Sequence, residues 1–377
     1  MEVWMILLLI VCCIFMEGLF LALIPWLQRR HECFSVTVPA SAQADPRLRT
    51  LKQRYTILMV VLTLVLSVVV SAASLAGDSL STLAGEIRFV ILLVGGALGL
   101  CLVSFVVMLA FRKKVQAIKA AEGWRATSSR VSAAVSEGDI PQAISLKWNL
   151  AYLPVILMSG VLGAVLYDSM PDMVAMNMDL SGNVSNWTPK SPSVVVFPLA
   201  VQAFIAACFV FSHWSISRSK RPLDPSAPAA SALAYGMFAR AQSIYLVAGG
   251  LALAAVLGVV FMLSSAEVIG LGVAAMMVMA VAMLLVIGAV GISVVYGQAG
   301  SRVFVRLQGE DLILADEDAH WKLGVFYFNP EDPSLFLPER FGVGWTVNLA
   351  RPAVWAIMIA GVVITVGFVV GISLLVG

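Results

Sequence analysis

The sequence predicts an all-α polytopic membrane protein, and three observations carry that prediction. Hydrophobic residues make up 60% of the chain and charged residues only 12%, whereas a soluble domain usually carries about 25% charged residues. The mean hydropathy is high, at +0.95. Eight apolar stretches are each long enough to cross a bilayer, which takes roughly 20 residues of helix. We expect the spans at residues 3–27, 56–76, 89–111, 150–167, 194–214, 244–264, 271–296 and 352–376.

The first apolar stretch is expected to be a retained span, because no basic region precedes it and it is longer than the apolar core of a signal peptide. Residues 1–111 then hold the first three membrane helices. Glu17 lies near the middle of the first span, where a charged side chain costs on the order of 2.5–3.5 kcal/mol. We expect it to face the bundle interior or a cavity, either as a proton or cation coupling site or in an interhelical hydrogen bond.

Basic residues predict the orientation of the chain. Of the 24 Lys and Arg residues, all but Arg88 and Lys190 fall in four segments that alternate with pairs of spans. The positive-inside rule places these segments in the cytoplasm and both termini outside the cell. The four basic segments are residues 28–55, 112–149, 215–243 and 297–351.

The segments after the third span divide into five expected regions. In the cytoplasmic loop at 112–149, an amphipathic helical pattern indicates either a helix on the anionic inner leaflet or a helix that docks a partner. Its apolar face consists of Val115, Ile118, Ala121 and Trp124. The other regions are a helix pair at 150–214, a connector with helices six and seven at 215–296, an aromatic cytoplasmic segment at 297–351, and the last helix at 352–377.

An ordered extracellular loop is expected at residues 168–193, between the two helices of the pair. Pro171 and Pro189 stiffen its two entries, and Ser181-Gly182-Asn183 indicates a tight turn. We expect Trp187 to lie at the membrane interface. The aspartates of the loop lack the spacing of an EF-hand, so we expect no bound calcium.

The aromatic segment at 297–351 is predicted to contain a small β-hairpin, because VFVRL and LILAD alternate around Gln308-Gly309. A strong turn signal follows at Asn329–Pro333. Two interpretations are open: a compact cap packed on the inner membrane surface, or a docking platform for a cytosolic partner. The candidate partner surface consists of Trp321, Lys322, Tyr327, Asn329, Arg340 and Trp345.

The sequence shows no arrangement of residues that predicts catalysis. It contains no HExxH, GxSxG or Walker motif. His213 beside Trp214 is typical of the aromatic belt at a membrane interface. The five cysteines form no CxxC and lie in apolar runs or a basic loop. We therefore expect a protein that is not an enzyme and holds no cofactor or metal. The net charge of +2 gives no reason to expect direct nucleic-acid binding.

Small residues in several spans are spaced for close helix packing. Gly95 and Gly99 form one GxxxG pair, and Gly367 and Gly371 form another. Gly250, Ala254 and Gly258 continue the pattern in the sixth span. We expect these positions to pack within the chain.

Two stretches resemble known families. LYDSMPDMVAMNMDLSGNVSNWTPKS resembles the signature of a bacterial membrane domain found in SdpI-like toxin-immunity proteins, and DAHWKLGVFYFNPEDPSLFLPERFGVGWTVNLARP resembles a companion cytoplasmic domain of uncharacterised function. The chain departs from the first signature at Asn177, where the family usually has His, at Asp179, where it has Asn, and at Ser185, where Asp is common. The positions that match it are Pro171, Asp172, Gly182, Trp187 and Lys190.

SdpI-like proteins protect a cell against a secreted peptide toxin and can signal by sequestering a transcriptional repressor at the membrane. The resemblance therefore implies a bacterial cytoplasmic membrane protein of immunity or signal-transduction type. Its partners would be membrane lipid, a secreted peptide or envelope ligand, and a cytosolic repressor or other regulator. Movement of spans four and five toward the aromatic segment would be the relay between the outer ligand and the cytosolic partner. The alternative is a transporter or lipid-handling protein that uses Glu17 in a membrane cavity. The candidate ligand-binding residues are Asp172, Asn177, Asp179, Gly182, Trp187 and Lys190.

Overall fold

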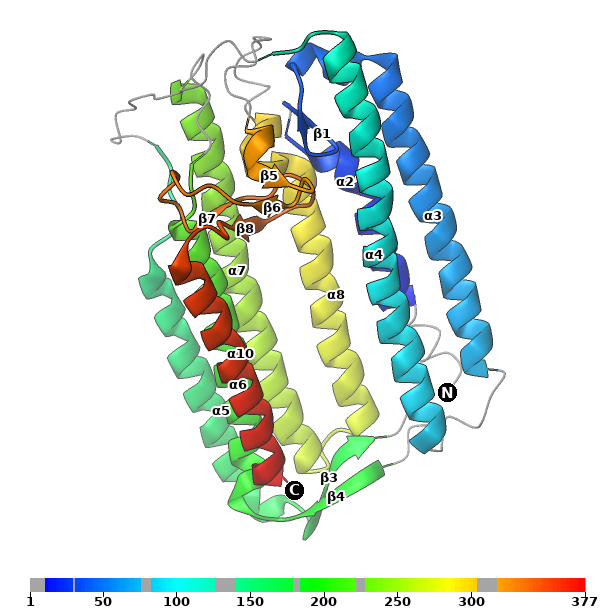
Figure 1. Cartoon of the computed structure of the whole chain (residues 1–377). Helices are drawn as coiled ribbons and strands as arrows, with labels where there is room; N and C mark the ends of the chain where they lie inside the picture. The colour runs from blue at the N-terminus through cyan, green and yellow to red at the C-terminus, as the bar shows by residue number, and fades with distance from the viewer. Residues whose placement is uncertain are drawn as a thin grey trace.

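The protein is a bundle of long apolar helices (Figure 1). The computed structural model describes residues 11–29, 31–75, 83–125, 140–178, 184–221, 228–303 and 317–376. Within these residues, seven helices are long and apolar enough to cross a membrane, and a shorter apolar helix covers Cys13–Leu27. Most of their large apolar side chains point outward, which suits contact with lipid and not with water. The prediction of an all-α multi-pass membrane protein is confirmed.

The first helices form an N-terminal three-helix unit. A π-helical turn, η1 (Val11–Phe15), leads into α2 (Met16–Leu27), and α3 (Pro46–Leu75) and α4 (Leu83–Ala121) pack beside it. Both long helices continue past the expected spans at the same end of the bundle. There Phe34 packs against Tyr55 and Phe111, with ring centroids 5.5 and 5.3 Å away.

Residues 112–121 are helical as expected, but they continue α4 and do not form a separate helix. Val115 is fully buried, and Ile118 and Trp124 pack against the core of the N-terminal unit. Part of the apolar face of this segment is therefore covered by protein, whereas Ala121 is exposed. The two roles expected for the loop at 112–149, contact with the inner leaflet and docking of a partner, stay predictions, because residues 126–139 lie outside the described part of the chain.

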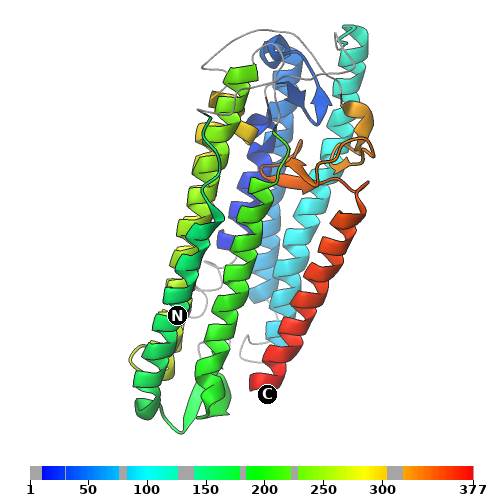
Figure 2. The ribbon, with the colours of Figure 1, turned by 90° about the vertical axis from the view of Figure 1, so that its left-hand side faces the viewer.

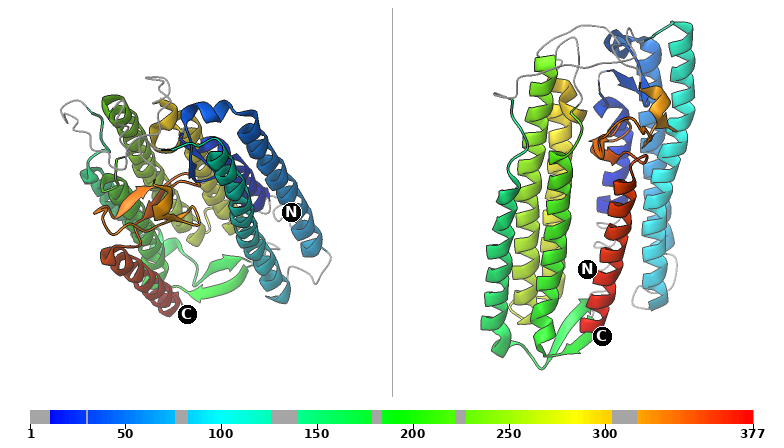
Figure 3. Two further views of the ribbon diagram at one scale, coloured as in Figure 1. Left: turned by 45° about the horizontal axis from the view of Figure 1, so that its top comes forward. Right: turned by 60° about the vertical axis from the view of Figure 1, so that its left-hand side comes forward.

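The remaining helices form a C-terminal five-helix unit around α7 (Figures 2 and 3). The helix α7 packs against α5, α6 and α8, while α10 packs against α6, where Phe204 and Phe368 stack at 4.1 Å. The two units meet along α2 and α8. The elements are η3 (Leu146–Ala151), α5 (Tyr152–Leu166), α6 (Pro192–Ser217), α7 (Pro228–Ser265), α8 (Leu271–Tyr296) and α10 (Pro352–Val376).

Close helix packing occurs at only some of the predicted glycines. Gly258 lies against Gln202 and Ser159, and a Cβ atom there would overlap both side chains. Gln202 donates hydrogen bonds to the Ser159 hydroxyl at 2.9 Å and to the Ala254 carbonyl at 2.7 Å. The prediction was wrong for the two GxxxG pairs. A Cβ atom added to any of their four glycines would meet no described atom within 4 Å. These glycines are Gly95, Gly99, Gly367 and Gly371.

Short antiparallel strand pairs and 3-10 turns occupy the two ends of the bundle (Figure 1). The pair β3–β4 lies at one end, and the other three pairs lie at the opposite end together with the basic segments. The hairpin expected around Gln308-Gly309 falls outside the described residues. The strands are β1 (Glu32–Cys33), β2 (Val36–Thr37), β3 (Met173–Met178), β4 (Val184–Pro189), β5 (Trp321–Lys322), β6 (Phe326–Tyr327), β7 (Phe336–Pro338) and β8 (Trp345–Val347), and the turns are η2 (Ala40–Ala44), η4 (Tyr167–Ser169), η5 (Gln298–Gly300) and η6 (Asp318–His320).

Candidate functional site

The predicted outer loop forms a β-hairpin that lies across the end of α8 (Figure 1). In its register Ala175 pairs with Trp187 and Val174 with Thr188. Successive side chains of a strand point to opposite faces. Val174 accordingly is buried against the helix ends, whereas Met173 is exposed and Trp187 is 48% exposed. The hairpin therefore presents one apolar aromatic side chain on its outer face.

Lys190 fixes the base of this hairpin. Its ammonium group donates hydrogen bonds to the carbonyl of Asp168 at 3.1 Å and to that of Met170 at 3.0 Å. It also lies 5.1 Å from the centre of the Tyr167 ring. The backbone N–H of Lys190 donates to the carbonyl of Asp172 at 2.7 Å. Lys190 thus acts as a clamp between the two ends of the loop, and its charge is already engaged.

The helix α6 runs from the hairpin to the opposite end of the molecule. It begins at Pro192, directly after the hairpin, and Val194 is buried beneath β3. At its other end, Trp214 packs edge-on against Phe336 of β7 with ring centroids 5.4 Å apart. Just beyond the helix, the Lys220 N–H donates to the Phe336 carbonyl at 2.8 Å. Any displacement of α6 along its axis would therefore reach both ends.

Residues 317–351, which we call the inner cap, form a compact unit around buried aromatic rings. Trp321 and Tyr327 pack 5.1 Å apart, and the Tyr327 hydroxyl donates to the Asp332 carboxylate at 2.9 Å. The turn expected here is present, because the Asn329 and Asp332 side chains accept backbone N–H groups two residues on, at 2.9 Å each. The cap is held by its own core as well as by the helices below it.

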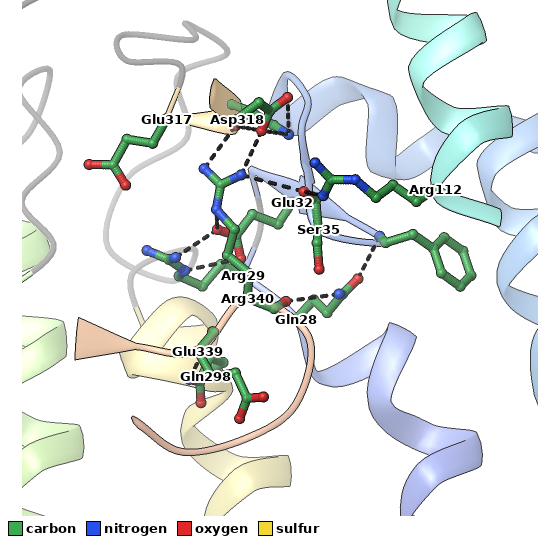
Figure 4. A network of polar contacts seen from close by, with 12 residues as sticks. Gln28, Arg29, Glu32, Ser35, Arg112, Gln298, Glu317, Asp318, Glu339 and Arg340 are labelled. Atoms are coloured by element: carbon green, nitrogen blue, oxygen red, sulfur yellow. Dashed lines mark hydrogen bonds and ion pairs between the residues drawn. The ribbon is translucent and has the colours of Figure 1, made fainter. Parts of the chain in front are cut away.

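Arg340 connects the inner cap to the N-terminal unit (Figure 4). Arg340 is only 3% exposed, and its guanidinium group lies 2.5 Å from the Asp318 carboxylate and 3.1 Å from that of Glu32. The Arg340 carbonyl accepts a hydrogen bond from the Gln28 amide at 2.9 Å. Lys119, from the end of α4, contacts the other oxygen of Asp318 at 2.7 Å. A buried, hydrogen-bonded network of charges therefore joins three segments that are remote in sequence.

The cap carboxylates are shifted in opposite directions. Burial alone would raise the pKa of Asp318, but Arg340 and Lys119 outweigh it and hold that pKa well below its usual range. Burial also opposes ionisation of Asp332, yet the hydrogen bonds from Lys220 and Ser334 lower its pKa to about 2. For Glu339, burial is uncompensated and raises the pKa to about 7. The cap therefore holds a carboxyl group that titrates near neutral pH.

Glu17 lies on α2 in the N-terminal unit, where its side chain is half-buried. Its carboxylate accepts a hydrogen bond from the Cys101 thiol of α4 at 3.0 Å. This is the interhelical hydrogen bond that was one of its two expected roles. Gly18 beside it packs directly on Thr63 of α3.

The predicted outer residues gather on one element as far as they are described. Asp172 is exposed at the start of the hairpin, the Asn177 backbone pairs with Asn186, and Trp187 and Lys190 follow on the second arm. Asp179 and Gly182 fall outside the described residues. Residues 173–176 are all apolar, so the sequence shows no polar–apolar alternation there that would have predicted the strand.

The candidate partner residues of the cap are mostly internal. Trp321, Tyr327 and Arg340 are buried, and Trp345 stacks on Phe238 of α7 at 5.4 Å. Asn329 is half-buried, and only Lys322 is exposed. Sequence reasoning noted the aromatic residues of this segment but could not tell which apolar side chains the cap exposes, and it did not indicate the network around Arg340, whose partners carry no local pattern. The exposed set is Leu323, Phe326 and Phe328.

Family comparisons match the two regions at the ends of α6. Residues 155–201, which include the hairpin, match a domain of unknown function, DUF1648. That domain occurs in SdpI-like proteins. Residues 330–355, from the inner cap, match a family of unknown function, DUF5808. No curated protein and no solved structure matches the chain. The fold and the matched domains together define a multi-pass membrane protein with two domains of unknown function.

Proposed function

We propose that this chain is a non-enzymatic bacterial membrane protein of immunity or signal-transduction type. In this proposal the hairpin β3–β4 faces the outside of the cytoplasmic membrane and meets a secreted peptide or envelope ligand. The inner cap faces the cytoplasm and holds a repressor or another regulator. The orientation rests on the distribution of basic residues, and the class of function rests on the resemblance to SdpI-like proteins.

The observation that carries the proposal is the continuity of α6 between the two regions. Its first turn supports the hairpin through Val194, and its last turn packs on the cap through Trp214. A ligand can shift a conformational equilibrium only by its differential affinity for two states. A rigid helix in contact with both regions supplies the mechanical connection through which such a difference at the hairpin would reach the cap.

The form of the hairpin supports a peptide as the ligand. A two-stranded sheet has unpaired backbone groups along its outer edges, and an extended peptide can add to such an edge as a further strand. The six residues of β4 carry no charge that would discourage pairing. Trp187 adds an exposed aromatic side chain, the residue type that most often dominates binding energy at interfaces.

Protection of cells tests this proposal. Cells that produce the full chain are challenged with secreted bacterial toxin peptides, and protection is compared for the wild type, a deletion of residues 172–187 and Trp187→Ala. We expect the deletion to abolish protection and Trp187→Ala to weaken it at least tenfold, with membrane insertion unchanged. Trp355→Ala, at an equally exposed Trp on α10, is the matched control. Full protection by the deletion variant would refute the proposal.

A transporter or lipid-handling role for Glu17 is the alternative, and it predicts the opposite pattern. Under that function, Glu17→Gln would remove activity while the hairpin variants remained active. Under the proposal made here, Glu17→Gln retains protection, because the amide can still accept the hydrogen bond from Cys101. The two variants therefore distinguish the two functions in the same assay.

A further inference from the structure

A polar cavity of about 440 Å³ lies beside α7 at the end of the bundle that carries the inner cap. It is lined by residues 140–145, which we call the strap, together with Trp148 and Arg240. The strap leads into the 3-10 turn η3 and then into α5, which stands at the left-hand edge of the bundle (Figure 1). The cavity therefore opens at the periphery of the protein.

Buried polar groups hold the strap in a fixed shape. The ring of His213 on α6 is fully buried and joins the Ile144 carbonyl, 2.9 Å from Nε2, to the Asn149 amide, 3.0 Å from Nδ1. The Ser243 hydroxyl on α7 accepts the Ile144 N–H at 3.0 Å. Since the carbonyl can only accept, Nε2 carries the ring proton. His213 thus serves the strap and is not the interfacial aromatic-belt residue that its sequence context indicated.

The helix beneath the strap is shaped to receive it. Gly236 of α7 lies under the carbonyl of Pro141, and a Cβ atom at this position would overlap that carbonyl. Arg240 follows one turn later on the same helix and points into the cavity that the strap leaves open. The cavity is therefore preformed, and binding there would require little ordering of the chain.

The charge of the cavity favours an anion. Arg240 is exposed, and no carboxylate of the described residues forms an ion pair with it. Neither the strap nor Trp148 contributes an acidic group. The Ser145 hydroxyl oxygen accepts the N–H of Lys147 at 3.3 Å, so its own hydrogen remains available for a ligand. Lys147 adds a second exposed cation beside the cavity.

The position of the cavity along the bundle favours the headgroup of a lipid. Trp148 is 63% exposed, and two apolar residues that follow it are also exposed, Leu150 in η3 and Leu153 at the start of α5. Tryptophan is enriched at the level of the headgroups, with apolar residues on its membrane side. Basic pockets at this level are suited to anionic headgroups.

We propose that this cavity binds the phosphate group of an anionic phospholipid. Arg240 pairs with the phosphate oxygens, Ser145 donates a hydrogen bond to them, and Trp148 lies against the glycerol region of the lipid. A guanidinium group suits this task because its planar donors match two phosphate oxygens at once. The site is separate from the hairpin and does not depend on the proposed sensing function.

Native mass spectrometry of the full-length protein in detergent tests the site. The protein is mixed with equal amounts of phosphatidylglycerol and phosphatidylcholine with the same acyl chains. We expect the wild type to retain phosphatidylglycerol preferentially, Arg240→Gln to lose roughly tenfold in that preference, and Arg240→Lys to keep part of it. Arg49→Gln, at an exposed arginine at the same end of the bundle, should match the wild type.

Two controls make the outcome decisive. An unchanged thermal unfolding midpoint shows that Arg240→Gln is folded, as its exposed position predicts. A second arm adds millimolar inorganic phosphate without lipid. Binding of phosphate that depends on Arg240, without any preference between the lipids, would assign the site to a soluble phosphate and overturn the lipid assignment. Equal retention of phosphatidylglycerol by Arg240→Gln and the wild type would overturn the site itself.

Discussion

The hairpin β3–β4 and the inner cap are both small β structures at the two ends of α6, but different forces hold them. The hairpin is fixed by backbone pairing and by the clamp of Lys190, and its most prominent side chain, Trp187, is exposed. The cap is fixed by buried ion pairs around Arg340 and by an aromatic core. Trp187 of the hairpin is therefore exposed, whereas Arg340 of the cap is buried in its connection to the N-terminal unit.

Under the proposed function, this difference fits a division of roles within the molecule. Buried ion pairs bring little net stability compared with apolar packing, but breaking one by removing a single partner is strongly destabilising. In the proposed function, a cap joined in this way would respond as a unit to movement of the helices beneath it. A hairpin held by its backbone tolerates changes of its exposed side chains, which suits a recognition surface.

The largest expected effect comes from Arg340→Met. Removal of the guanidinium group leaves the carboxylates of Asp318 and Glu32 buried with fewer partners, at a cost of about 3–5 kcal/mol. The loss in free energy of unfolding is measured by denaturant titration in detergent, with proteolysis of the cap as the signal for unfolding. Arg49→Met, at an exposed site, should change the free energy of unfolding by less than about 0.5 kcal/mol. Similar small changes in both variants would show that the network does not hold the cap.

A smaller effect is expected in the pH dependence of the stability of the cap. Because burial raises the pKa of Glu339 from 4.5 to about 7, the folded cap keeps this proton over a range in which the unfolded chain loses it. Stability therefore falls as the pH rises from about 4.5 to 7, by about 1–3 kcal/mol. Glu339→Gln should abolish that fall when thermal unfolding is measured across this range.

Asp332 gives the opposite dependence at lower pH and serves as an internal control. Its folded pKa of about 2 lies below the ordinary value of 3.8, so its contribution is lost only as the pH falls below about 4. The Glu339→Gln variant should still lose stability below about pH 4, as the wild type does. A fall in stability between pH 4.5 and 7 that is the same in the variant and the wild type would exclude Glu339 as its cause.

Lys190→Met should loosen the hairpin and leave the cap unchanged. The substitution removes two hydrogen bonds from a charged group, and we expect a local loss of about 1–2 kcal/mol because the ammonium is partly exposed. Hydrogen exchange of the backbone amides at 173–178 and 184–189 measures it. Lys322→Met, at an exposed lysine of the cap, is the control. Unaltered exchange in the hairpin would mean that its strands need no clamp.

The smallest change in stability is expected for Trp187→Ala. The side chain lies on the outer face of the hairpin, so its loss should change the free energy of unfolding by less than about 0.5 kcal/mol. The same substitution should reduce protection in the cell assay. A large loss of stability would contradict the assignment of Trp187 to a recognition surface.

The sequence predicts the membrane helices well because a span must be long and apolar whatever its neighbours are. It predicts their ends less well: α3 and α4 extend into the water-facing end, where helix propensity and packing against Phe34 replace hydropathy as the signal. The GxxxG spacing also fails at Gly95 and Gly367, because spacing permits close approach without supplying a neighbour.

The site is predictable only where its signal is local. The turn at Asn329–Pro333 and the position of Trp187 follow from short patterns in the chain. The pairing of Arg340 with Glu32 joins positions about 300 residues apart, and nothing in either neighbourhood indicates it. Aromatic residues of the cap looked alike in the sequence, and only the fold separates buried Tyr327 from exposed Phe326.

The most direct test of the account is whether the cap and the hairpin are coupled through α6. Phe336→Ala removes the cap side chain that packs on Trp214, and hydrogen exchange then reports on the distant amides of β3 and β4. We predict faster exchange of the hairpin amides in Phe336→Ala. In Phe326→Ala, which removes an exposed aromatic ring of the same cap, we predict an exchange rate equal to that of the wild type. Hairpin exchange in Phe336→Ala equal to that of the wild type would contradict the account.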